Sequence, residues 1–363
     1  MLNASTAFRP HFWQGADAIV IRSASILLSA YFVMKKSMPT LRDVAAAAGV
    51  STATVSKLIN GAQRFSPQVE ETVRAVIAQL GYRSNPHAQS MTTGRSKSIG
   101  LSVLDIANPH FTSIVKGANR VALARGYTLL LVDTEEDPGR ERPLLEALSR
   151  RVDGMLVFSR TPEAQMDWLA ELGKPLVFFG RLARLDVPWV AADERRGAAM
   201  LARHLITLGH RHIAYLGFPA ARRDEERMSS IRDCLAAHDL TLTVYSGEAP
   251  SGSEGERWCA PIMLGHAHPD ALICYNDLMA LGFMKAAQAL GFGVPKDISV
   301  AGFDNIEFGR YATPALTSVD LQSERMGATA MEQLIASIDG EVAAPPALIE
   351  PLLVLRASAQ QRA

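Results

Sequence analysis

A predicted helix that begins at Thr52 presents short hydrogen-bonding side chains with one cation and no acid: Thr52, Ala53, Thr54, Ser56, Lys57 and Asn60. Small side chains permit close approach, and polar groups of this kind pair with base edges and phosphates in the major groove of DNA. A solvated helix face is the plain alternative, but such faces usually mix Glu with Lys. The absence of acid therefore favours DNA binding.

A second group of residues follows the ends of predicted strands: Asp105, Asn108, Asp133, Gly180, Asn276, Asp277, Asp304 and Asn305. In open parallel sheets, ligands bind outside the carboxyl ends of the strands. These positions are therefore candidates for binding a small molecule.

Sequence signatures of catalysis are lacking, since GxxxxGK[ST], GxGxxG after a strand, HExxH and GxSxG do not occur. The HxH pairs at 210–212 and 266–268 lie at predicted turns, with no carboxylate or cysteine nearby in sequence to complete a metal set. We predict no enzyme activity, no metal and no cofactor.

The acid-free helix belongs to a group of three. Helices over 41–48 and 52–59 are separated by a short turn containing Gly49, and Ser51 caps the second. A third helix, over 67–80, starts with proline in its first position. This order predicts a helix-turn-helix.

A short helix of about two turns is proposed over 86–93, with Asn85 as its cap. Isolated helices need roughly 12–15 residues to be stable in water, so this one would fold only on a partner. A plain linker is the alternative.

From Ser98 onward, apolar runs of strand length alternate with stretches of helical period. The predicted strands are 98–106, 127–133, 153–159, 175–180, 189–192, 212–218, 240–246, 270–276, 298–303 and 348–355, and the clearest helices are 109–125, 194–208, 277–290 and 323–338. Such alternation predicts parallel sheets covered on both faces, and this many strands predict two doubly wound sheets.

Composition is that of an ordinary globular protein, with 37 basic and 37 acidic side chains in 363 residues. The balance is uneven, because residues 38–97 carry seven bases against three acids. A basic module on an acidic body suits contact with a polyanion. Three cysteines without CxxC spacing fit a reducing cytoplasm.

The first 37 residues contain an apolar stretch, Ala18–Met34, that is interrupted by Arg22. We interpret this segment as a disordered extension or a start-site artefact. An extra helix and a membrane element are the alternatives, although the stretch is short for a bilayer and carries its charge inside.

Several separate motifs, in order over 39–357, resemble the lactose/galactose repressor family. They are LRDVAAAAGVSTATVSKLIN (41–60), GYRSNP (81–86), IGL (99–101), DIANPHF (105–111), HLITLGHRHIAYLG (204–217), YNDLMALG (275–282) and DISVAGFDN (297–305).

The resemblance implies a homodimer on a pseudo-palindromic operator, with recognition helices in the major groove and paired hinge helices in the minor groove. By position, Thr52, Ala53 and Lys57 would read bases. The remaining implied DNA contacts, several of them to phosphate, are Leu41, Arg42, Ser51, Thr54, Ser56, Asn60, Arg64, Tyr82, Asn85, Ala88, Gln89 and Met91.

Two hinge positions depart from the family pattern. Met91 stands where the minor-groove wedge is usually leucine, and Gln89 replaces a common arginine. Methionine is apolar and adaptable, so we expect wedging to persist, while the lost cation weakens the hinge's affinity.

The core is similar to periplasmic sugar-binding proteins, which implies two subdomains, a cleft, and crossover strands near 190–193 and 317–321. The implied effector-binding residues are Asp105, Asn108, Phe111, Arg181, Arg227, Asn276 and Asp304. An arginine fork with polar partners suits vicinal hydroxyls. Structural roles are the alternative for two of these residues: a turn cap for Asp304 and a surface charge for Arg227.

Two departures bear on the ligand. Gly180-Arg181 stands where sugar-responsive members often have an acid, and Pro250 occupies the place of a stacking aromatic. A neutral hexose is therefore less expected than usual, and Arg181 favours an acidic or phosphorylated ligand.

The predicted fold is an all-α helix-turn-helix domain joined to an α/β core of two doubly wound subdomains. The predicted segments are an extension (1–37), a DNA-binding domain (38–84), a hinge (85–97) and a core (98–363), with an N-subdomain at 98–190 and 322–343 and a C-subdomain at 191–318 and 345–358.

The predicted function is that of a cytoplasmic, effector-responsive transcriptional repressor. The chain stops seven residues past Arg356 without a heptad, so we expect a dimer and no higher oligomer. We also expect no membrane partner. A solute-binding or transport receptor that uses the same cleft, and a DNA-binding regulator without an effector, are the alternatives.

Overall fold

The computed structural model describes residues 39–59, 63–82, 94–266, 268–342 and 345–362. The chain divides into two units, Met1–Gln89 and Ser90–Ala363, each described by itself. The predicted extension over 1–37 and the predicted hinge helix over 86–93 fall outside the described ranges. Within those ranges no helix is long and apolar enough to cross a membrane.

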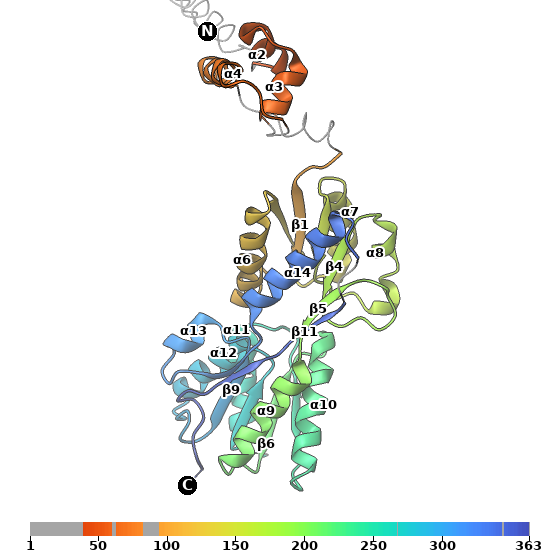
Figure 1. The fold of residues 1–363 in the computed structure, drawn as a ribbon. Helices are drawn as coiled ribbons and strands as arrows, with labels where there is room; N and C mark the ends of the chain where they lie inside the picture. The colour runs from red at the N-terminus through yellow and green to blue at the C-terminus, as the bar shows by residue number, and fades with distance from the viewer. Residues whose placement is uncertain (1–38, 60–62, 83–93, 267, 343–344, 363) are drawn as a thin grey trace, which may run out of the picture. The chain divides into compact units, whose positions relative to one another are not determined.

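Three helices build the first unit (Figure 1): α2 (Leu41–Ala48), α3 (Thr52–Ile59) and α4 (Pro67–Leu80). Thr40 and Asp43 close a capping box at the start of α2, and Gly49 ends it with a φ of 67° that few residues other than glycine adopt. One valine from each helix, Val44, Val55 and Val73, is fully buried. This shared core fixes α3 against its neighbours, and the predicted helix-turn-helix is confirmed.

The second unit contains two six-stranded sheets. The first has the order β11-β5-β4-β3-β1-β2 and is wholly parallel, whereas the second, β12-β10-β9-β8-β6-β7, has one antiparallel pair, β10 with β12. The strands are β1 (Ser98–Val103), β2 (Thr128–Asp133), β3 (Gly154–Val157), β4 (Leu176–Phe179), β5 (Trp189–Ala192), β6 (Ile213–Gly217), β7 (Thr243–Ser246), β8 (Ala271–Cys274), β9 (Ser299–Phe303), β10 (Thr317–Asp320), β11 (Ala347–Ile349) and β12 (Leu352–Val354).

Helices cover both faces of each sheet, as buried strands on both faces require. In the first sheet α6 and α14 share one apolar core and α7 and α8 another, and in the second the pairs are α9 with α10 and α11 with α12. Their bounds are α6 (Pro109–Ala124), α7 (Pro138–Ser149), α8 (Trp168–Glu171), α9 (Glu194–Thr207), α10 (Arg222–Ala236), α11 (Gly252–Met263), α12 (Asp277–Ala289) and α14 (Ser323–Ile338); η1 (Glu163–Gln165) and α13 (Glu307–Tyr311) are short. The predicted pair of doubly wound subdomains is confirmed.

Close approach of α6 and α14 depends on two glycines. A Cβ on Gly117 would lie 1.9 Å from the carbonyl oxygen of Glu324, and one on Gly327 would lie 2.0 Å from that of Ile114. The two backbones therefore touch at these positions, which seats α14 on the first subdomain.

The chain passes between the subdomains three times, and the structure places two crossings differently from the sequence prediction. The predicted strand 348–355 is two strands: β11 pairs with β5 in the first sheet, and β12 pairs with β10 in the second. All of β5, through Ala192, likewise belongs to the first sheet. The first subdomain thus reaches beyond residue 190 and includes 347–349, which the prediction gave to the C-subdomain.

Candidate DNA-binding face and effector cleft

The N-terminal end of α3 carries the exposed face that the sequence indicates for DNA. Thr52, Ala53 and Lys57 are exposed, and Ser51 Oγ accepts a hydrogen bond from the backbone N–H of Thr54 at 3.0 Å. Lys57 Nζ donates to Gln63 at 3.1 Å, so the cation is held near the surface without a carboxylate partner in the described residues. This face can meet the major groove without acidic repulsion.

The other predicted DNA contacts divide into two groups. Arg42 and Arg64 are exposed, and Leu41, Thr54, Ser56 and Tyr82 are half-buried. Asn60, Asn85, Ala88, Gln89 and Met91 lie outside the described residues.

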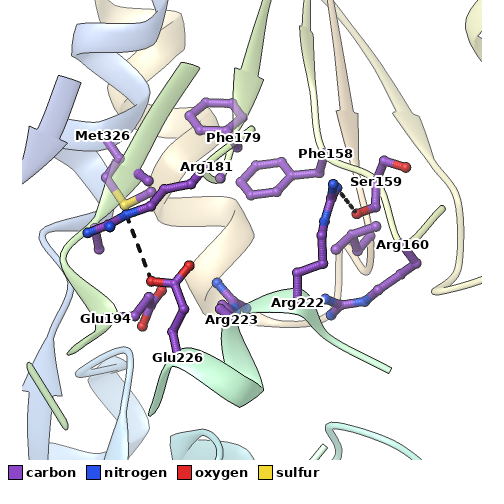
Figure 2. A pocket seen from close by; sticks show the side chains of 14 residues that line it. Phe158, Ser159, Arg160, Phe179, Arg181, Glu194, Arg222, Arg223, Glu226 and Met326 are labelled. Atoms are coloured by element: carbon purple, nitrogen blue, oxygen red, sulfur yellow. Dashed lines mark hydrogen bonds and ion pairs between the residues drawn. The ribbon is translucent and has the colours of Figure 1, made fainter. Parts of the chain in front are cut away.

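A cavity of about 70 Å³ lies between the two subdomains of the core. The first subdomain contributes residues at the carboxyl ends of β3 and β4, and the second contributes the first turns of α9 and α10 (Figure 2). The lining residues are Leu104, Phe158, Ser159, Arg160, Phe179, Gly180, Arg181, Ala191, Ala192, Glu194, Arg222, Arg223, Glu226 and Met326. It is a cleft at strand ends, where the sequence predicts a ligand.

Phe158 and Phe179 form an apolar wall, with their rings stacked 4.2 Å apart. Phe111 packs edge-on against Phe158, with 5.1 Å between ring centroids, and is itself buried. Phe111 thus supports the wall from behind and does not line the cavity.

Next to the cavity, Arg227 is fully buried and bound on three sides. Its Nε donates to Glu194 at 2.7 Å, its Nη1 donates to the carbonyl of Tyr275, and its guanidinium lies 4.1 Å from the centroid of the Phe303 ring. The Nη2 atom has no hydrogen-bond partner among the described residues. Arg227 is therefore not a surface charge, and it keeps one donor for another molecule.

Asp304 follows β9 and is also buried, and neither carboxylate oxygen has a hydrogen-bond partner in the described residues. The turn-cap interpretation of Asp304 is therefore wrong. Its φ of 100° is a conformation that side chains other than glycine rarely adopt. An unpaired buried carboxylate on strained backbone is a feature that binding sites retain.

Electrostatics around Asp304 come from burial and from two arginines. Burial raises the pKa of Asp304 to about 6, and the guanidinium groups of Arg223 and Arg227 oppose that rise. Burial, together with the same two arginines, holds the pKa of His110 well below its ordinary value. At neutral pH the site therefore holds a carboxylate and a neutral imidazole.

The remaining predicted effector residues have structural contacts. Asn108 caps α6, Asn276 caps α12 while donating to the carbonyl of Pro250 at 2.9 Å, and Asp105 accepts from the N–H of Ala107. Of the seven predicted residues, Arg181 alone lines the cavity. Arg227 and Asp304 do not line it, but Arg223, which does, attracts Asp304 and repels Arg227 electrostatically.

Sequence reasoning missed most of the polar wall. Ser159 and Arg160 follow β3, so the strand-end rule could have found them, but the predicted strand ran to 159 and enclosed the serine. Arg222 and Arg223 looked like part of a surface charge cluster. Their place in the cleft depends on the packing of the other subdomain, which a local pattern does not contain.

The histidine pair at 210–212 has a carboxylate neighbour that the sequence does not show. His210 and His212 both face the carboxylate of Asp270, at 3.3 Å and 3.9 Å, although no carboxylate is close in sequence. Asp270 accepts from the backbone N–H groups of Arg211 and His212, so it holds a turn. No group of three or more potential metal ligands occurs within the described ranges.

A helix-turn-helix domain followed by a two-subdomain core with a cleft defines a class of ligand-binding transcriptional regulators. Residues 40–85 match the family model of bacterial regulatory proteins of the lacI family, and 202–359 match a periplasmic binding protein-like domain. The transcriptional repressor PurR of Pectobacterium atrosepticum is 34% identical over 310 residues, 83% of this chain and 91% of that protein. The chain belongs to the lacI family of bacterial regulatory proteins and is a DNA-binding transcriptional regulator.

Solved structures agree with the fold. A Lac repressor dimer bound to operator and an anti-inducer superposes with a TM-score of 0.81 at 25% identity, covering 89% of this chain and 99% of that one. A complex of the transcriptional regulator CelR with cellobiose has a TM-score of 0.66 at 30% identity, covering 88% and 99%. Both structures contain a small-molecule ligand by their descriptions.

Proposed function

We propose that the protein is a homodimeric, cytoplasmic repressor whose affinity for a pseudo-palindromic operator is set by a sugar or sugar derivative bound between the core subdomains. The operator and the dimer in the Lac repressor structure, and the cellobiose in the CelR structure, support this proposal.

On the DNA side, Thr52, Ala53 and Lys57 read bases in the major groove. Ser51, Thr54, Ser56, Asn60 and Arg64 position the helix on phosphates, and the hinge residues, with Met91 as the wedge, enter the minor groove. The exposure of Thr52, Ala53 and Lys57 on α3 supports this assignment.

The observation that carries the effector proposal is the set of unpaired buried atoms beside the cleft. Asp304 offers two acceptors and Arg227 offers a donor, and none has a hydrogen-bond partner among the described residues. Leaving buried polar groups unpaired costs about 1–3 kcal/mol each. Sugar hydroxyls, which both donate and accept, can satisfy both side chains at once.

Regulation follows from the location of this site. Arg227 and Glu194 belong to the second subdomain, whereas His110, Phe158 and Ser159 belong to the first. A ligand that touches both shifts the equilibrium between subdomain angles by its differential affinity, typically about 1–3 kcal/mol of coupling. The hinge helices connect that change to the operator.

The test uses the full-length protein. Operator sequences are selected from random duplex DNA, and the affinity for the best site is measured with and without a panel of neutral and acidic sugars. We expect a two-fold symmetric site and a change of about 5–150-fold with one panel member. Sugar binding without any selected DNA site would contradict the proposal and favour the solute-receptor alternative.

A further inference from the structure

We infer that the effector is an anionic sugar derivative, a sugar acid or a sugar phosphate, whose charged group is bound by Arg222 and Arg223. This inference rests on the proposed function, because it concerns the ligand of the same cleft. Its basis is the charge of the cavity wall and the partners of each guanidinium.

Four arginines and two glutamates line the cavity. Two of the arginines are neutralised by the protein: Arg160 pairs with Glu136, and Arg181 lies 3.6 Å from Asp193 and 3.8 Å from Glu226. Arg222 and Arg223 are different, because no carboxylate oxygen of the described residues lies within 4.0 Å of either guanidinium. The wall thus carries two cations without a direct ion pair, of which Arg223 also lies in the field of Asp304 and Glu194.

The contacts that Arg222 and Arg223 do make are to neutral groups. Arg222 donates to the carbonyl of Ser159 at 3.2 Å and to the sulfur of Met166 at 3.5 Å, as Figure 2 shows for Ser159. Its guanidinium also lies 4.9 Å from the ring centroid of Phe178. Burial lowers the pKa of Arg222, which is the expected sign for a cation that is withdrawn from water without an ion pair.

Arg223 also makes its direct contacts to neutral groups, although Tyr275, Asp304 and Glu194 raise its pKa. Its Nε donates to the hydroxyl of Tyr275 at 2.7 Å, and its Nη1 lies 3.3 Å from Nε2 of His110. Each guanidinium has five N–H donors, and the contacts given use two on each. Donors therefore remain for a bidentate carboxylate or phosphate, the anions that the guanidinium fork fits best.

Both arginines start α10 in the second subdomain, and the partners Ser159, Met166 and His110 belong to the first. The side chains therefore bridge the cleft. A ligand that enters the cavity between the subdomains therefore meets these two guanidinium groups. An anion can replace the weak neutral partners of Arg222 and Arg223, whereas a neutral sugar would leave Arg222 without an ion pair.

The rest of the ligand meets acceptors. Glu226 Oε2 is buried without a hydrogen-bond partner in the described residues, and burial raises the pKa of Glu226. Together with Asp304, it offers acceptors to the hydroxyl groups of a ligand.

The experiment compares Arg222→Gln and Arg223→Gln with Arg232→Gln. Arg232 lies on the same helix, is exposed, and makes the same charge change, so it is a matched control. Thermal unfolding of the full-length proteins is followed at constant ionic strength. Each neutral sugar is compared with its anionic counterparts: galactose with galacturonate, and glucose with glucuronate and glucose 6-phosphate. Acetate and inorganic phosphate are tested as minimal anions.

We expect at least one anionic sugar to raise the melting temperature of wild type while its neutral counterpart does not. Its affinity should fall tenfold or more in R222Q and R223Q and stay within twofold in R232Q. The carboxylate and phosphate arms identify which anion the site prefers. Without ligand, R222Q should unfold at the same temperature as wild type or higher, because it loses a buried charge that has no ion pair. If R222Q does not fold, Arg222→Lys replaces it in the affinity measurement, because lysine keeps the charge but cannot bind an anion through two parallel N–H groups.

Equal stabilisation by neutral and acidic sugars, retention of anion affinity in R222Q and R223Q, or no effect of any anion beyond chloride would each overturn the inference. A neutral sugar that changes operator affinity would overturn it while leaving the proposed function intact. Anion binding through Arg222 and Arg223 without any change in operator affinity would support the anion site but contradict the proposed function.

Discussion

His110 and Asp304 face each other across the two subdomains, with 3.5 Å between Nδ1 of the imidazole and Oδ1 of the carboxylate. Both side chains are inaccessible to solvent. The same imidazole nitrogen lies 2.9 Å from the hydroxyl of Ser323, which starts α14. A neutral histidine thus contacts the buried carboxylate without neutralising it, so Asp304 remains available to a ligand.

The first prediction concerns stability and pH in Asp304→Asn. Because the folded-state pKa is raised from 3.8 to about 6, folding binds a proton between these values, and the ionised carboxylate destabilises the protein above pH 6. The shift corresponds to a penalty on the order of 2–3 kcal/mol at pH 7.5. We expect D304N to be more stable than wild type by about 1–3 kcal/mol at pH 7.5, and by progressively less as the pH falls to 5.

Urea unfolding of the full-length protein at pH 7.5, 6.5 and 5.5 measures this difference. His110 has a lowered pKa in both proteins, so its own loss of stability below pH 6.5 cancels in the comparison. A difference between D304N and wild type that is independent of pH would show that Asp304 titrates normally.

The second prediction concerns the effector response of Asp304→Ala. If Asp304 accepts ligand hydroxyls, its loss removes the link between ligand and the second subdomain, and the change in operator affinity with effector should disappear. Asp186→Ala, an exposed aspartate at the edge of the first subdomain, is the control and should respond as wild type does. Operator binding is measured by fluorescence anisotropy with and without ligand. A normal response in D304A would place the effector elsewhere.

Much of the fold was predictable because apolar runs and caps are local. The helices α3, α12 and α14 begin at Thr52, Asp277 and Ser323, the positions that the sequence predicts. The strand β10 matches the crossover strand near 317–321 that the family resemblance implies, but the apolar pattern alone did not show it, because Thr317 and Ser318 are polar. Both are fully buried and hydrogen-bonded, and Ser318 donates to Asp277 at 2.6 Å. Polarity satisfied by distant partners cannot be read from periodicity.

The candidate site was predictable where a single strand end fixes the position, as for Gly180 and Asp304, or where the family resemblance points to a residue, as for Arg181. It was not predictable where the position depends on two subdomains meeting. Arg222 and Arg223 lie in a run of charges that reads as a solvated helix start, and only the first subdomain, through Ser159 and His110, withdraws them from water.

The third prediction concerns the contact of α6 with α14. Alanine stabilises a helix relative to glycine by about 1 kcal/mol. At Gly327, however, the alanine Cβ would lie 2.0 Å from the carbonyl oxygen of Ile114, so the backbone of α6 or α14 would have to move. Gly327→Ala should therefore destabilise the protein by about 1–3 kcal/mol or more. Gly252→Ala in α11 is the control, since its Cβ would lie 3.5 Å from the nearest atom. The midpoints of denaturant unfolding of the two variants measure this difference. Equal stability of the two variants would mean that α6 and α14 are further apart than the structure places them.

The last prediction concerns α3 and the operator. Each phosphate contact contributes about 0.9 to the slope of log affinity against log salt on duplex DNA. Arg64 is assigned to phosphate, and Lys57, although assigned to a base, brings a cation into the phosphate-lined groove. Both are exposed, so Lys57→Ala and Arg64→Ala should each flatten that slope by about one neutralised phosphate, whereas Arg74→Ala, an exposed arginine on α4, should leave it unchanged. Replacing Thr52 should instead change which base is preferred at one position, by about 1–3 kcal/mol. The measurement is operator affinity from 50 to about 200 mM salt. Unchanged slopes in both lysine and arginine variants would remove α3 from the DNA interface.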